Sequence, residues 1–170
     1  WMTESTRQEA RKKLKAITVK VGYPDQWPQD KYSLVLKSPD EGGVYIDNIM
    51  EILKASQDYS FKTRHDPVDR NEWGMTPQTV NAYYNPGNNE IVFPAGILQA
   101  PFYDPEAEPV ANLGGIGAVI GHEITHAFDT SGSQYDEKGN LRDWWTAQDK
   151  QRFRELAQKV IDYYDTMEVN

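Results

Sequence analysis

Gly121-His122-Glu123-Ile124-Thr125-His126-Ala127-Phe128-Asp129 is the stretch from which the fold and the chemistry of this chain are best approached. It contains the pattern His-Glu-x-x-His. Residues four apart on a helix lie one above the other on the same face. The pattern therefore predicts a helix on which His122 and His126 offer two imidazole nitrogens to one metal ion.

The side chain between the two histidines suits a catalytic role. Glu123 follows the first histidine, so its carboxylate can reach a water molecule at the metal and accept a proton from it, as general bases do. The chain has three His, and two of them fall at this spacing around a Glu. We therefore favour a metal site over two ordinary structural histidines, and we expect the third, His65, to be a surface or loop residue.

Asp129 is the other candidate near the motif. It lies three residues past His126 on roughly the same helix face, so it could bind the metal or orient a neighbouring group. A helix-end Asp that bonds to local backbone is the more favoured interpretation.

The third protein ligand of a catalytic zinc site is not supplied by the motif, since such a site takes three ligands and leaves one position open. A metzincin would place another His ten residues after the first, where this chain has Gly132, and no His follows. The metzincin interpretation therefore fails, and a carboxylate from elsewhere could instead supply the third ligand.

Composition narrows the function classes. The chain has 170 residues. Its net charge of −8 argues against a nucleic-acid partner. The absence of Cys excludes disulfide bonds and a thiolate metal site. No apolar run is long enough to span a membrane, so no membrane anchor is visible. Trp1-Met2-Thr3-Glu4 reads as the middle of a longer protein. The basic run Lys12, Lys13, Lys15 and Lys20 is expected to form a solvated helix face.

Periodicity predicts mainly helices with one β-hairpin, an α+β fold. We expect helices at about 6–17 and 44–56, a buried motif helix capped by Asn112, and a last helix from the Thr146 cap to about Asp165. The hairpin strands are expected at 79–84 and 90–93 around the turn 85–89. The other segments are expected to be irregular, with a short extended piece at 32–36, and Trp144-Trp145 is expected to pack in the core.

Several segments, taken in order, resemble the neprilysin and endothelin-converting-enzyme family of zinc endopeptidases, and the absence of Cys is similar to its bacterial members. The resemblance covers about residues 3–165 and is carried by Asn81-Ala82-Tyr83-Tyr84, the segment 91–99, Gly114-Gly115-Ile116-Gly117, the segment 119–126, Phe128-Asp129 and Asp143-Trp144-Trp145.

The resemblance implies a thermolysin-like gluzincin catalytic core that hydrolyses peptides. It implies zinc bound by His122 and His126, with Glu123 as the catalytic base. It also implies that Asn81 and Ala82 hold a peptide substrate as an added strand at the hairpin edge, which fits an edge strand open to β-augmentation.

One departure from the family pattern bears on activity. In the family, the third zinc ligand is a Glu in a downstream Glu-Asn-x-Ala-Asp segment, and this chain lacks that segment. We therefore expect residues 1–170 to be part of a catalytic domain whose remainder is a partner, and to be inactive alone. The alternative is a non-catalytic module that binds peptide or zinc. The resemblance to bacterial members suggests a secreted, periplasmic or surface-anchored parent protein, with a cytoplasmic one as the alternative.

Overall fold

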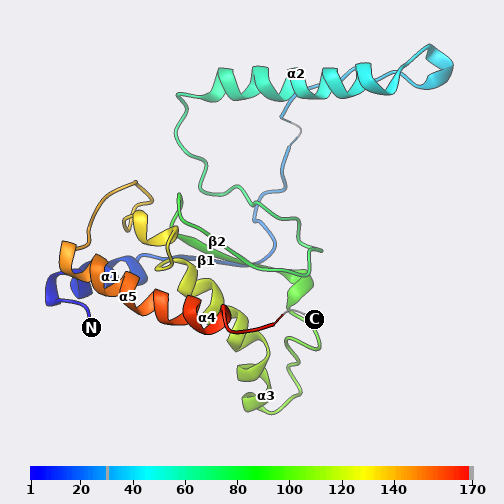
Figure 1. The fold of residues 1–170 in the computed structure, drawn as a ribbon. Coiled ribbons are helices and arrows are strands. Elements are labelled where there is room, and N and C mark those ends of the chain that lie inside the picture. The colour runs from blue at the N-terminus through cyan, green and yellow to red at the C-terminus, as the bar shows by residue number, and fades with distance from the viewer. Residues whose placement is uncertain (30, 169–170) are drawn as a thin grey trace. The chain divides into compact units, whose positions relative to one another are not determined.

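The computed structural model describes residues 1–29 and 31–168, which divide into two compact units. One unit joins Trp1–Tyr23 to Trp73–Asn170, and the other is Pro24–Glu72. The larger unit contains α1 (Glu4–Lys15), β1 (Thr18–Gly22), β2 (Tyr83–Asn85), β3 (Glu90–Pro94), η2 (Ala95–Ile97), α3 (Pro109–Gly114), α4 (Ile116–His126), η3 (Gly132–Gln134) and α5 (Ala147–Tyr164) (Figure 1).

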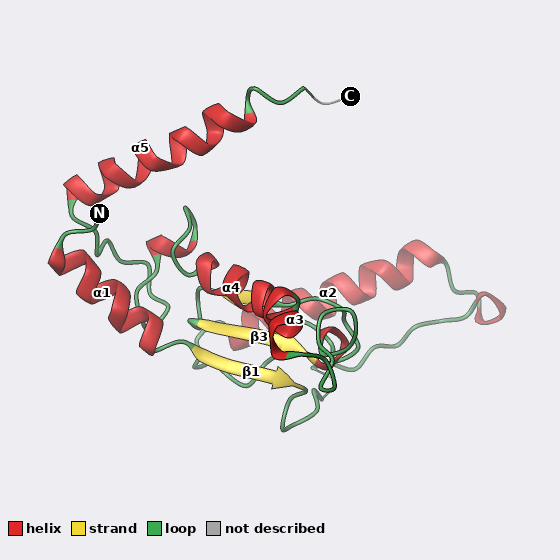
Figure 2. Cartoon of the chain, turned by 90° about the horizontal axis from the view of Figure 1, so that it is seen from below, coloured by secondary structure: helices red, strands yellow, loops and turns green. Residues whose placement is uncertain are grey.

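The larger unit contains a three-stranded sheet in the order β1-β3-β2. β1 and β3 lie side by side in Figure 2. The predicted hairpin is confirmed, because β2 pairs antiparallel with β3. The ladder begins only at Tyr83, so Asn81 and Ala82 come just before the paired part of β2. β1 was not predicted: it follows the first helix directly and pairs in parallel with β3, with Val19 opposite Ile91.

The core forms where the sheet meets the motif helix. Its buried members are Ala82, Ile91, Phe93, Ile97 and Ile116, and α4 packs against β2. β3 is buried along its whole length, as expected for the middle strand of a sheet. The mainly helical α+β class predicted from the sequence is therefore correct.

The motif helix differs from its prediction at its start. Asn112 does not cap it, because Asn112 lies within α3. Its side-chain oxygen instead accepts a hydrogen bond from the Asp104 amide at 2.9 Å. α3 ends at Gly114, and α4 begins after Gly115, whose φ and ψ of −88° and −100° are not helical. A Cβ at Gly115 would lie 2.3 Å from the Phe102 carbonyl oxygen, so the close approach of that loop explains the break.

The smaller unit holds η1 (Pro39–Glu41) and α2 (Tyr45–Thr63). α2 ends at Thr63, about two turns beyond the predicted end at 56, and the expected extended piece at 32–36 forms no strand. His65 is exposed just after α2, as expected of a surface histidine.

Polar contacts join the N-terminal ends of the two terminal helices, α1 and α5. The main-chain amide of Thr3 donates to Asp149 Oδ1 at 2.9 Å, and Thr146 caps α5 by accepting from the Asp149 amide at 3.1 Å. The predicted cap of α5 is thus confirmed. α1 begins at Glu4, two residues earlier than predicted, with Thr3 in the cap position.

The expectation of a solvated basic face on α1 is wrong for Lys13, which is 1% exposed. Lys20 is also largely covered, because its ammonium pairs with Glu90 at 2.8 Å. Trp144 is buried as expected, whereas Trp145 is half-buried and stacks on Trp1. Among the described residues, no helix combines the length and the apolar character needed to cross a membrane.

Candidate metal centre

α4 presents His122 and His126 on one face, one helical turn apart. Their Nε2 atoms lie 3.0 Å from each other, and their ring centroids are 4.5 Å apart with planes at 87°. Two nitrogens at ~2.0–2.1 Å from one tetrahedral zinc ion would lie about 3.3–3.4 Å apart. The two rings therefore converge at nearly the separation that a shared zinc ion requires, and the donor set fits such an ion.

The second nitrogen of His126 has a carboxylate partner. His126 Nδ1 lies 2.8 Å from Asp129 Oδ2. The other oxygen of Asp129 accepts hydrogen bonds from the amides of Ser131 and Gly132, both at 2.8 Å. An Nδ1–H bond to a carboxylate leaves the Nε2 lone pair available for a metal.

The ionisation of Asp129 supports the same arrangement. Partial burial pushes its pKa up, but the hydrogen bonds from His126, Gly132 and Ser131 outweigh burial and hold the pKa below its usual value. Asp129 is therefore a carboxylate at neutral pH. It bonds to local backbone, as the sequence favoured, and it also contacts His126.

The catalytic candidates share one cavity of about 370 Å³. Glu123 is only 5% exposed, yet it lines this cavity together with both histidines. Asn81 and Ala82 line it from the strand side, so the structure brings together the residues that the sequence singled out. His65 belongs to the other compact unit.

The strand beside the cavity lies at the edge of the sheet. β2 pairs with β3 on one side, and the sheet order places it outermost. Asn81 Oδ1 accepts from the amide of Ala82 at 2.9 Å, which fixes the peptide that leads into β2.

Within residues 1–29 and 31–168, no group of three or more His, Cys, Asp or Glu side chains is placed to hold a metal ion. The described residues bring together two imidazoles and one carboxylate that contacts the second of them.

Two residues that support the centre were missed by sequence reasoning. A Cβ at Gly132 would lie 1.9 Å from the carbonyl oxygen of His126, so only glycine allows the chain to return against the end of α4. Lys13 bonds to the same turn. Its burial had no signal in the sequence, because a lysine on a helix is ordinarily exposed.

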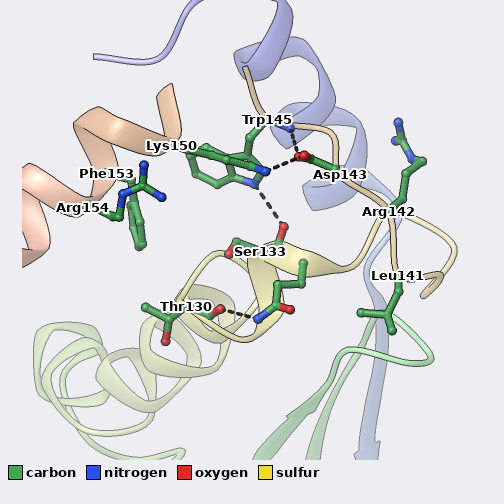
Figure 3. A pocket seen from close by; sticks show the side chains of 10 residues that line it. Thr130, Ser133, Leu141, Arg142, Asp143, Trp145, Lys150, Phe153 and Arg154 are labelled. Carbon is green, nitrogen blue, oxygen red and sulfur yellow. Dashed lines mark hydrogen bonds and ion pairs between the residues drawn. The ribbon is translucent and has the colours of Figure 1, made fainter. Parts of the chain in front are cut away.

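A second cavity, of about 610 Å³, lies away from the motif, between the loop after α4 and the start of α5 (Figure 3). Trp145 and Phe153 form its apolar wall, and the Trp145 indole N–H donates to the Ser133 carbonyl at 3.1 Å. Neither histidine of the motif lines it, so it is distinct from the candidate metal centre.

Comparison with known proteins gives consistent matches. The sequence model of peptidase family M13 matches residues 81–170. The chain is 44% identical over 170 residues to the neutral endopeptidase of Lactococcus lactis subsp. cremoris, and 42% identical over 175 residues to human endothelin-converting enzyme 1. These matches cover 99% and 100% of the chain but 26% and 22% of the relatives, so the chain spans about a quarter of their length.

A solved structure is similar to this chain in both sequence and fold. The chain superposes on the crystal structure of the zinc metalloprotease Zmp1 of Mycobacterium tuberculosis, in complex with an inhibitor, with a TM-score of 0.86 at 51% identity. That match covers 99% of this chain and 25% of the other.

Proposed function

Because this chain belongs to peptidase family M13, we propose that it is the motif-bearing part of the catalytic domain of a zinc endopeptidase with a thermolysin-like core. The observation that carries the proposal is the pair of Nε2 atoms 3.0 Å apart beside a buried glutamate in one cavity. The family relationship and the local geometry both support the same site.

The zinc ligands contributed by this chain would be His122 and His126 through Nε2, with Asp129 orienting His126. The third protein ligand would be a glutamate from a part of the parent protein that residues 1–170 do not include. Bound zinc lowers the pKa of a water molecule and polarises a carbonyl oxygen. Residues 1–170 alone would bind zinc weakly and would not turn over substrate.

Glu123 would act as the general base. Its carboxylate takes a proton from the water that attacks the scissile carbonyl and then donates that proton to the departing amine. Because the side chain is 5% exposed and lines the cavity, bulk water competes little for this proton. Proton transfer by a positioned carboxylate contributes about 10²–10⁴-fold in rate.

The substrate would lie along β2 as an added strand. The Asn81 side chain and the Ala82 backbone would hold its main chain, since both residues line the cavity and precede the edge strand. Main-chain hydrogen bonds give such a site affinity for peptides in general, and side-chain pockets give selectivity.

Metal removal from the full-length protein that carries this chain tests the proposal. Cleavage of an internally quenched peptide should stop when a chelator strips the metal and should return on addition of one equivalent of zinc. His122→Ala should abolish this recovery, whereas His65→Ala should leave it intact. Cleavage that persists in the stripped protein would refute the proposal, and chelator-insensitive peptide binding without cleavage would favour the non-catalytic module.

A further inference from the structure

We propose that Lys13 is a positioning residue for the metal centre: its buried ammonium holds the turn that carries Asp129 and thereby sets the orientation of His126. This inference rests on the proposed function. Lys13 lies 113 positions before His126 in the sequence, on α1, and it touches neither histidine.

The ammonium of Lys13 has a complete set of acceptors. Nζ donates to the carbonyl oxygens of Ala127, Gly132 and Tyr135 at 2.8, 2.6 and 2.8 Å. An ammonium has three N–H donors, so all of them are used. Burial of an unpaired ammonium would be costly, and this convergence of three carbonyls explains how Lys13 can be 1% exposed.

The three carbonyls lie on both sides of Asp129 in the sequence, which is the residue that contacts His126. Ala127 follows His126 directly and caps α4, so its carbonyl is one of those that a helix leaves unpaired at its end. Gly132 and Tyr135 come after the turn. Lys13 thus joins the end of α4 to the chain that returns past Asp129, and its positive charge opposes the negative end of the α4 dipole.

The position of Asp129 depends on the hydrogen bonds between Lys13 and this turn. The Gly132 amide donates to Asp129 Oδ1, while the Gly132 carbonyl accepts from Lys13. One peptide residue therefore contacts both the lysine and the carboxylate. If the Gly132 carbonyl loses the ammonium, the turn loosens, and Asp129 Oδ2 no longer holds His126 Nδ1 in one orientation.

Negative groups and aromatic rings near the Lys13 ammonium stabilise its positive charge. Asp136 and Asp129 are the negative groups that act on Lys13, and the rings of Phe128 and Tyr84 lie 5.7 and 5.8 Å from Nζ. Burial nevertheless lowers the pKa of Lys13 to about 8, against the opposing pull of the two carboxylates. At neutral pH the side chain is still mainly an ammonium.

Other contacts hold α1 in place without the Lys13 side chain. Glu9 pairs with Arg142 at 2.5 Å, and Lys12 pairs with Glu137 at 2.8 Å. The Lys13 carbonyl accepts from Asn89 Nδ2 at 3.2 Å. A variant at Lys13 therefore keeps these anchors of the helix and loses the three hydrogen bonds of the ammonium.

The test compares Lys13→Met with Lys12→Met in the full-length protein. Methionine matches the length of the lysine stem without its donors, and Lys12 is the neighbouring lysine, paired at the surface. Zinc affinity is measured by competition with a chromogenic chelator, and amide exchange over 127–135 is followed by mass spectrometry. We expect Lys13→Met to weaken zinc binding about 10-fold and to speed exchange in that segment, with Lys12→Met close to wild type.

A double-mutant cycle separates positioning from general destabilisation. If Lys13 acts through Asp129, the effects of Lys13→Met and Asp129→Asn on zinc affinity should be less than additive, because the two changes break the same link. Full additivity would overturn the proposal, as would wild-type zinc affinity in a folded Lys13→Met protein.

Lys13→Arg keeps the test decisive if Lys13→Met does not fold. A guanidinium retains the charge but cannot aim three donors from one point, so this variant should fold and bind zinc more weakly than wild type. Wild-type affinity in Lys13→Arg would then contradict the proposal. A wild-type protein that binds no zinc would refute the proposed function itself, whereas normal zinc binding in every Lys13 variant would remove only the positioning role.

Discussion

His126 Nδ1 lies 2.8 Å from Asp129 Oδ2, three residues further along the chain, and an ionised carboxylate at this place can only accept a hydrogen bond from the ring. Asp129→Asn would keep an oxygen for the Ser131 and Gly132 amides but turn an NH₂ group toward the ring. The ring would then protonate on Nε2, the atom that faces a metal. We expect zinc affinity to fall by about 10–100-fold, measured by chelator competition.

The control for Asp129→Asn is Asp143→Asn, because Asp143 is an exposed aspartate whose partner is Lys150, away from the histidines. Its zinc affinity should match wild type. Equal zinc affinity in Asp129→Asn and wild type would show that the carboxylate does not orient the ring.

Gly132 is the second point at which the turn is fitted to the metal centre. A Cβ at this position would lie 1.9 Å from the His126 carbonyl oxygen, so Gly132→Ala must push the turn away from α4. We expect a loss of about 1–3 kcal/mol in unfolding free energy, measured by chemical denaturation. Gly114→Ala is the matched control, because nothing lies within 4 Å of a Cβ there; a loss of equal size in Gly114→Ala would contradict the steric explanation.

Asn81 should affect substrate binding more than metal binding. It lines the cavity next to β2 and is not one of the two imidazole side chains that converge there. Removal of one substrate hydrogen bond by Asn81→Ala should lower kcat/KM by about 3- to 10-fold with zinc affinity unchanged, as seen in steady-state kinetics on a quenched peptide. Asn71→Ala, in the other compact unit, is the control. Unchanged kcat/KM in Asn81→Ala would remove Asn81 from the substrate site.

Asp149 makes the packing of the terminal helices depend on pH. Its burial would raise the pKa, but hydrogen bonds from Thr3, Thr6 and Thr146 outweigh burial and lower it. The folded pKa thus lies below the unfolded value of about 3.9, so the stabilisation is present above about pH 4 and is lost as the pH falls through the folded pKa.

Thermal unfolding of the metal-free protein can show this effect. Asp149→Asn should be less stable than wild type at pH 7, and the difference should shrink at pH 3, where this carboxyl group is mostly protonated in the unfolded chain but still ionised in the folded one. A difference of the same size at both pH values would mean that the carboxylate charge is not what stabilises the contact.

Local sequence patterns predicted the parts of the site that depend on near neighbours. The spacing of His122 and His126 needed only helical geometry, and the hairpin followed from the alternation on either side of Asn85-Pro86-Gly87-Asn88-Asn89. Thr146 was recognisable as a cap because its partner, Asp149, is three residues away.

Features that depend on distant contacts were not predictable in this way. β1 forms because it pairs with β3 some seventy residues later, and α3 separates from α4 because the Phe102 carbonyl approaches Gly115. Lys13 was expected in solvent because an isolated lysine prefers water, and its burial depends on three carbonyls more than a hundred residues away.

Glu123→Gln in the full-length protein tests the central claim most directly, because glutamine keeps the shape of the side chain but cannot accept the proton. Zinc content is measured on the same sample as peptide cleavage. The account predicts one zinc per site, as in wild type, with kcat/KM lowered by about 10²–10⁴-fold. Normal zinc content with wild-type cleavage would contradict it.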